Sequence, residues 1–203
     1  MVVRASAYMK AGGMNRRQAG EDFYFIQKLV MMGGYFNLNT TKVYPASRAS
    51  SRVPFGTGAT ITRLTSSDNN NLLTYSAGSY LELREIDRKL PDLFYAQPGD
   101  YAKIYETLPA GFKMYAQYNE WNWTISEIKS NVSSFEAFRK RYYDWFNMFR
   151  FVKYMNQAHR SVYKKVPVMS AAEQILKISG VTNIPDNERD MLIRYRELEA
   201  GCN

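Results

Sequence analysis

The sequence predicts a mainly helical α+β protein, in which a short mixed region precedes a longer helical region. Two observations lead to this prediction. After about residue 65, apolar residues recur every three or four positions, as they do on one face of a helix, and prolines separate the segments. Before that point, the chain is rich in glycine and arginine and offers only short extended pieces. We therefore expect two parts, residues 1–65 and residues 66–203.

The composition indicates a folded protein with a basic surface. Of the 203 residues, 45% are hydrophobic and 15% are aromatic, which is enough for an apolar core. The net charge of +8 is compatible with nucleic acid, an anionic membrane surface or a phosphorylated substrate. No recognition motif for nucleic acid accompanies this charge, and acidic residues alternate with basic ones along the expected helices. We therefore expect no nucleic-acid partner.

Cysteine and histidine are too scarce for a zinc site. Cys202 and His159 are the only residues of their kinds, which also excludes an intramolecular disulfide. We predict no metal-binding residue in this chain. The apolar runs are shorter than the ~20 residues of a membrane span, and the first ten residues lack the apolar core of a signal peptide. These features predict a cytoplasmic protein without a transmembrane segment.

The first part is expected to contain two helices and several extended pieces. Gly12-Gly13 and Gly33-Gly34 mark helix ends, because glycine is favoured just after a helix. The expected helices span residues 5–11 and 20–32, the extended pieces span residues 2–3, 35–38 and 42–44, and a loop leads into a further extended piece over residues 47–63.

The second part is expected to be a series of helices with prolines at their edges, Pro91 among them. The helices span residues 80–90, 99–108, 111–119, 123–131, 134–163, 170–179 and 187–199. Ser133-Ser134 predicts the N-cap of the longest one. Its apolar residues repeat at helical spacing, which predicts a buried face and not a surface for stacking bases. These residues are Phe135, Phe138, Tyr142, Trp145, Phe146, Phe149 and Val152.

The adjacent carboxylates Glu21 and Asp22 stand where a helix should begin, and two interpretations fit them. Acidic residues in a first turn oppose the positive end of the helix dipole and can cap free N–H groups. The same position keeps a carboxylate ionised, so that it could act as a general base on an acceptor hydroxyl. Adjacent side chains point about 100° apart on a helix, so one of the two would be the base and the other structural.

Two stretches carry a resemblance to a known family. The run VVRASAYMKAGGMNRRQAGEDFYFIQKL, followed by VYPASRASSRVPFGTG, resembles the second half of bacterial family 2 glycosyltransferases of the GT-A type. The ordered set GG, AGEDFYF and SRVPFGTG makes this resemblance more specific than a Glu-Asp pair alone. It covers roughly residues 2–63 and extends more loosely into FRKRYYDWFNMFRFVKY. It implies a partial GT-A-like α/β portion that carries the catalytic base on the acceptor side.

The resemblance assigns a role to each matching residue. Asp22 would deprotonate the acceptor hydroxyl in an inverting transfer from a nucleotide sugar, and Glu21 would support it. The acceptor side would be lined by Gly12, Gly13 and Met14. Guanidinium groups suit phosphate oxygens, so the candidates for the leaving diphosphate are Arg48, Arg52, Arg16 and Arg17. In this family we expect an acidic residue at the position of Ser51. The serine found here weakens the expectation of a charge pair at that position.

The donor side of such an enzyme is not visible in the sequence. The complete enzyme would use a divalent ion, Mg or Mn, held by an Asp-x-Asp motif that this sequence lacks. The nearest similar stretches, residues 85–87 and 186–190, are expected to be solvated helix faces or caps. We therefore expect a fragment that is inactive alone, with an exposed edge at Val2-Val3 through which it could self-associate.

One alternative belongs to a different class of function. The basic, aromatic helical part could be a non-catalytic interaction module that binds a partner protein or an anionic membrane surface. This alternative would place the protein at the inner face of the membrane.

Overall fold

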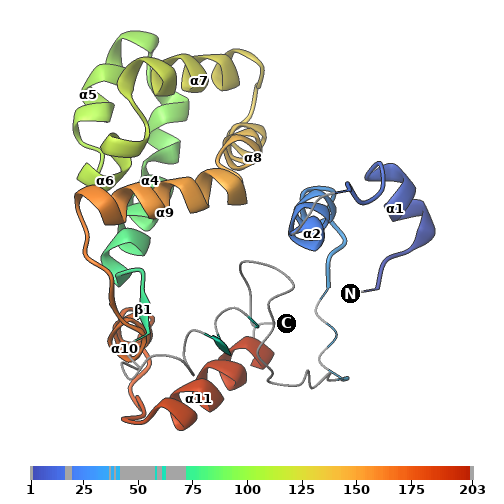
Figure 1. Ribbon diagram of the computed structural model, residues 1–203. Coiled ribbons are helices and arrows are strands. Elements are labelled where there is room, and N and C mark those ends of the chain that lie inside the picture. The colour runs from blue at the N-terminus through green and yellow to red at the C-terminus, as the bar shows by residue number, and fades with distance from the viewer. Residues whose placement is uncertain are drawn as a thin grey trace. The chain divides into compact units, whose positions relative to one another are not determined.

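The computed structural model describes residues 2–16, 20–36, 38, 40–41, 58, 61–62 and 72–201. This part of the chain is mainly helical and contains a small two-stranded sheet (Figure 1). The chain divides into two compact units, Met1–Asn71 with Tyr195–Asn203 and Leu72–Arg194. The boundary predicted near residue 65 falls outside the described residues, so it stays a prediction.

The first unit contains the two helices that the sequence predicts. These are α1 (Ala5–Lys10) and α2 (Glu21–Met31). No strand is assigned at residues 2–3 or 35–36 in the described chain, so the extended pieces predicted there stay predictions. Val2 is 99% exposed. Gly58, Ile61 and Thr62 have a helical backbone, so the extended conformation predicted there is wrong. The piece predicted at residues 42–44 lies outside the described residues.

The helical unit Leu72–Arg194 consists of short helices around a long one. Its sheet pairs β1 (Leu73–Thr74) with β2 (Val166–Pro167) in antiparallel fashion. The helices are α4 (Ala77–Tyr95), the 3₁₀ helix η1 (Pro98–Asp100), α5 (Tyr101–Glu106), α6 (Ala110–Tyr115), α7 (Tyr118–Ser130), α8 (Phe135–Trp145), α9 (Met148–Ser161) and α10 (Val168–Ile178), and α11 (Glu188–Gly201) begins here. In Figure 1, α9 crosses α4, and α5 to α8 lie around the same half of α4.

Helix α4 is longer than the sequence predicts. The side-chain oxygen of Ser76 accepts a hydrogen bond from the backbone N–H of Gly78 and caps its start. Pro91 lies inside the helix, so its predicted place at a helix edge is wrong. Leu90 and Leu93 are fully buried on either side of Pro91. This burial holds the helix together across the one hydrogen bond that proline cannot make.

The long helix predicted over residues 134–163 is two helices. Ser134 caps α8 as expected, but the side chain of Asn147 accepts hydrogen bonds from the N–H groups of Phe149 (3.0 Å) and Arg150 (3.3 Å) and starts α9. The break changes which residues face the core. Phe138, Tyr142 and Phe146 are buried as predicted, Val152 is exposed, and the buried residues of α9 are instead Tyr154, Met155 and Ala158.

The core of the helical unit surrounds a buried carboxylate. Glu82 is 7% exposed and accepts hydrogen bonds from the hydroxyls of Tyr154 (2.9 Å) and Tyr163 (3.0 Å) and from the backbone N–H of Gly111 (3.0 Å). These bonds join α4, α6 and α9. A Cβ on Gly111 would lie 2.5 Å from a carboxylate oxygen of Glu82, so any larger residue would have to displace this carboxylate. Burial is the main cause that raises the pKa of Tyr163 to about 12, and the Glu82 carboxylate adds to it.

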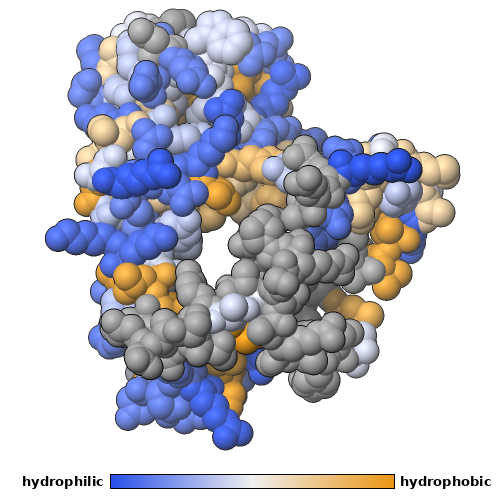
Figure 2. All heavy atoms as spheres, viewed as in Figure 1, coloured by the Kyte–Doolittle hydropathy of each residue, from blue (hydrophilic) through white to orange (hydrophobic). Residues whose placement is uncertain are grey.

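The two units differ in the surface that they expose. Figure 2 shows mostly hydrophilic residues over α5 to α8 and more hydrophobic residues over α1 and α2. Among the exposed apolar side chains of the first unit are Met9 and Phe36, which are 72% and 86% exposed. None of the helices in the described chain combines the length and the apolar content needed to cross a membrane.

Candidate functional site

The carboxylate pair stands in the first turn of α2. Gly20 precedes the helix with a φ of 76°, a left-handed conformation that glycine adopts without strain. Glu21 is half-buried and Asp22 is exposed. One carboxylate oxygen of Asp22 accepts a hydrogen bond from the backbone N–H of Phe23 (2.8 Å). Asp22 therefore lies at the positive end of the helix, where a negative charge is favoured.

A glycine turn ends α1 and forms the loop on the predicted acceptor side. Gly12 and Gly13 both have a φ of 71°, and their N–H groups donate to the carbonyls of Met9 (3.0 Å) and Tyr8 (2.9 Å). A Cβ on Gly13 would lie 3.3 Å from the Tyr8 ring. Glycine is therefore favoured at position 13 by backbone conformation and by packing.

Lys28 joins this loop to α2, and the sequence did not identify it as a site residue. Its ammonium group lies within hydrogen-bond distance of the carbonyls of Ala11 (3.3 Å) and Gly13 (3.5 Å) and of the side-chain oxygen of Asn15 (3.3 Å). These three acceptors match the three donors of an ammonium group. One sequence signal could have indicated this role: Lys28 interrupts an apolar run, where a charged side chain needs partners.

A second set of contacts brings the loop toward the start of α2. The Tyr8 hydroxyl accepts a hydrogen bond from the N–H of Met14 (3.2 Å), and the Tyr8 ring packs against Phe25 with centroids 5.2 Å apart. Phe25 is buried and follows Asp22 by three residues, which puts the two side chains on neighbouring positions of one helix face. The N–H of Met14 is thus bonded to one member of this aromatic pair, and Asp22 precedes the other member by three residues on α2.

Of the four arginines predicted to face the diphosphate, Arg16 lies among the described residues. Arg16 is exposed and follows the glycine loop. Arg17, Arg48 and Arg52 lie outside the described residues. Their assignment stays a prediction.

The described carboxylates do not form a divalent-metal site. No group of three metal-ligating side chains occurs among the residues that the structure describes. In the stretch 85–87, Asp87 accepts hydrogen bonds from the Tyr143 hydroxyl and from Arg139 (3.4 Å). In the stretch 186–190, the Asn187 side chain accepts a bond from the N–H of Asp190 (2.9 Å). Both stretches are helix faces or caps, as predicted.

The one histidine of the sequence has a structural role. His159 Nε2 accepts a hydrogen bond from the backbone N–H of Ser76 (2.8 Å), and Nδ1 lies 2.8 Å from the carbonyl of Met155. A neutral ring with the proton on Nδ1 satisfies both contacts. The ring therefore ties α9 to the start of α4.

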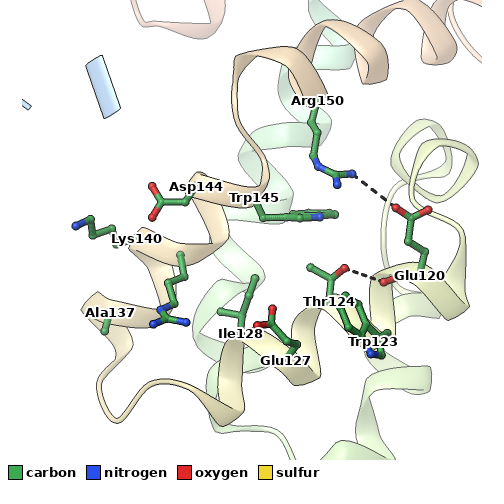
Figure 3. A pocket seen from close by; sticks show the side chains of 11 residues that line it. Glu120, Trp123, Thr124, Glu127, Ile128, Ala137, Lys140, Asp144, Trp145 and Arg150 are labelled. Atoms are coloured by element: carbon green, nitrogen blue, oxygen red, sulfur yellow. Dashed lines mark hydrogen bonds and ion pairs between the residues drawn. The ribbon is translucent and has the colours of Figure 1, made fainter. Parts of the chain in front are cut away.

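A groove in the helical unit is a second candidate, and none of its residues was predicted as a site. It has a volume of about 710 Å³ and lies between α7, α8 and the first turn of α9 (Figure 3). The residues that line it are Glu120, Trp123, Thr124, Glu127, Ile128, Ala137, Lys140, Arg141, Asp144, Trp145 and Arg150. The sequence placed Trp145 in the buried face of a single long helix, so the groove could not be expected from it.

Comparison with known proteins gives no relative for this chain: no protein-family model, curated protein or solved structure matches it.

Proposed function

We propose that this chain contributes the acceptor side of an inverting glycosyltransferase that uses a nucleotide sugar, with Asp22 as the general base. The observation that carries the proposal is the position of Asp22. Its carboxylate is exposed in the first turn of α2, one helical turn before the aromatic pair Phe25–Tyr8 that holds the glycine loop. A base must be open to its substrate and near the segment that binds it, and the exposure of Asp22 and its place in the first turn of α2 support this assignment.

The reaction would proceed by a single displacement. Asp22 accepts the proton of an acceptor hydroxyl while the hydroxyl oxygen attacks the anomeric carbon of the donor sugar. The bond from that carbon to the nucleoside diphosphate breaks, and the configuration at the carbon inverts. Glu21 supports the charge at the helix start, and Gly12, Gly13 and Met14 line the acceptor. Arg16, Arg17, Arg48 and Arg52 are proposed to face the leaving diphosphate.

The donor and its metal ion require residues beyond those of this chain. A divalent ion, Mg or Mn, would neutralise the charge that develops on the diphosphate. Asp87 and Asp190 do not fit this role, since both carboxylates already accept hydrogen bonds. The donors are Arg139 and Tyr143 for Asp87, and the side-chain amide of Asn187 (2.8 Å) for Asp190. The proposal therefore places the nucleotide-sugar site in a segment or partner that supplies an Asp-x-Asp motif.

A reading-frame comparison and a transfer assay test the proposal together. The DNA on the 5′ side of the Met1 codon is expected to encode strands and an Asp-x-Asp motif in the same frame. A protein that includes that region is expected to transfer sugar from a nucleotide sugar to a hydroxyl acceptor, whereas residues 1–203 alone are not. Equal transfer by residues 1–203 alone, or no transfer when a nucleotide-sugar-binding segment or partner is present, would contradict the proposal.

A second candidate function rests on the apolar surface of the first unit. Met9, Phe36 and Leu38 are 72%, 86% and 67% exposed, and apolar surface of this kind is a candidate for an interaction site. A non-catalytic module that binds a partner protein or an anionic membrane would cover these residues. Sedimentation with phosphatidylglycerol vesicles tests the membrane form. Binding that Met9→Ser and Phe36→Ser abolish would favour it, and no binding would count against it.

A further inference from the structure

The groove between α7 and α8 contains an exposed tryptophan that the core does not explain. Trp123 is 67% exposed, whereas Trp121, two residues away on the same helix, is 1% exposed. Ile128 and Thr124 form the floor beside it and are nearly buried. A large aromatic side chain at the rim of a defined groove is typical of a binding site.

A second tryptophan has a fixed orientation in the same groove. The Arg150 guanidinium lies over the Trp145 ring, 4.9 Å from its centroid, and pairs with Glu120 at 3.7 Å. Figure 3 shows the ring edge-on, between Arg150 on one side and Thr124 on the other. One face of Trp145 is therefore covered by the guanidinium, and the ring also packs against Tyr142 and Phe146 while it lines the groove.

The charges that line the groove balance one another. Three carboxylates (Glu120, Glu127 and Asp144) oppose three cations (Lys140, Arg141 and Arg150), so the lining has no net charge. A polyanion such as nucleic acid would meet all three carboxylates, which is unfavourable in a site that should neutralise phosphates. The lining instead offers hydrogen-bond acceptors and donors side by side, next to aromatic rings.

We infer that this groove binds a neutral oligosaccharide. The C–H face of a sugar ring is apolar and packs on an indole face, while its hydroxyls donate to carboxylates and accept from ammonium and guanidinium groups. Glu127 and Asp144 provide the acceptors, and Lys140 and Arg141 provide the donors. The volume of about 710 Å³ lies within the range of about 300–1,000 Å³ that small-molecule sites occupy.

This inference goes beyond the proposed transferase. The groove lies wholly within the helical unit and uses none of the residues assigned to base or diphosphate chemistry. Sugar binding here does not depend on Asp22, and a chain without transferase activity would still show it.

A glycan array probed with the full 203-residue chain tests the inference. We expect retention on neutral oligosaccharides, and Trp123→Ala is expected to weaken it at least tenfold. The matched control is Tyr95→Ala, which removes an aromatic side chain that is 73% exposed at the end of α4 and outside the groove. That variant should bind like the wild type. Both variants should keep the wild-type Tm, because each removed side chain is mostly exposed.

Three outcomes would overturn the inference. One is that no neutral glycan is retained, and another is that Trp123→Ala binds as well as the wild type. The third is binding confined to acidic glycans or to single-stranded DNA, with an affinity that falls steeply with salt. Transfer activity enters none of these results, so they are independent of the proposed function.

Discussion

The two units stabilise their helices by different means. In the first unit, Phe25 is the only buried residue among those described, and hydrogen bonds from Lys28 and packing of Tyr8 hold α1 and α2 together. In the described part of the helical unit, a cluster of 16 buried residues surrounds the Glu82 network. The helical unit therefore has a core of its own. The α1–α2 pair carries the proposed base but needs further apolar burial from outside itself.

The largest expected effect comes from truncating one buried side chain in each unit and comparing the loss of stability. Phe138 is fully buried, so Phe138→Ala should lower the free energy of unfolding of the helical unit by about 3–5 kcal/mol. The matched variant Phe25→Ala should leave the thermal transition of the helical unit unchanged, because Phe25 belongs to the other compact unit. Thermal unfolding followed by circular dichroism checks both. Equal losses in the two variants would mean that the units unfold as one.

The Glu82 network allows a test by a double-mutant cycle. Gly111→Ala should destabilise the helical unit by about 1–3 kcal/mol, because the added methyl group overlaps the carboxylate of Glu82. In a Glu82→Ala background the same change should cost much less, since the overlapping atoms are gone. Urea unfolding of the four proteins gives the coupling. Strictly additive losses would exclude the steric explanation.

High pH should weaken the helical unit selectively. Burial is the largest cause that raises the pKa of Tyr143 and of Tyr163 to about 12, and the carboxylates of Asp87 and Glu82 respectively contribute. A raised pKa means that the folded state keeps these protons to a higher pH than the unfolded state does. Their contribution is full below about pH 10, the ordinary tyrosine pKa, and is lost as pH rises toward 12.

Tm measured between pH 9 and pH 12 checks this expectation. It should fall over the upper part of the range, in step with tyrosinate absorbance, and Tyr143→Phe should flatten the decline. A Tm that stays constant to pH 12 would contradict the assignment.

The N-cap of α9 at Asn147 should contribute less to the free energy of unfolding than the core residues do. Asn147→Ala removes a side chain that accepts from two N–H groups at the start of α9, and should cost about 1 kcal/mol. Ser134→Ala, at the start of α8, is the matched control and should cost a similar amount. Urea unfolding measures both. If Asn147→Ala stabilised the protein, the two helices would be better described as one.

The smallest effect on global stability is expected at Lys28. Lys28→Met removes the donors that hold the glycine loop, so amide hydrogens of Gly12 to Met14 should exchange faster while the main Tm stays the same. Hydrogen exchange measured by mass spectrometry checks this. Unchanged exchange would mean that Tyr8 alone holds the loop.

Local signals in the sequence predicted the positions of most helices, but not where neighbouring helices begin and end. Glycine pairs and Ser134 indicate helix limits through backbone chemistry that acts within a few residues. The break at Asn147 escaped prediction, because aromatic residues continue on both sides of it. Pro91 led to the opposite error: the sequence predicted a helix end there, but the helix continues because Leu90 and Leu93 are buried on either side. Packing decided both cases, and packing is not visible in local spacing.

The candidate sites also differ in whether their contacts are local in the sequence or join distant segments. Glu21 and Asp22 could be placed at a helix start because their signal is local. The role of Lys28 depends on a loop 13 to 17 residues earlier in the chain, and the groove depends on how α7, α8 and α9 pack. Contacts of this kind come from the folded chain and leave only weak traces in its sequence.

The kcat of a matched pair of carboxylate variants tests the central claim most directly. In a protein that combines this chain with the proposed donor site, Asp22→Asn should lower kcat for sugar transfer by a factor of about 10²–10⁴, because the acceptor hydroxyl would lose its proposed base. Glu21→Gln, one residue earlier in the same helical turn, should have a much smaller effect. Full kcat in Asp22→Asn, or a larger loss in Glu21→Gln, would show that Asp22 is not the base.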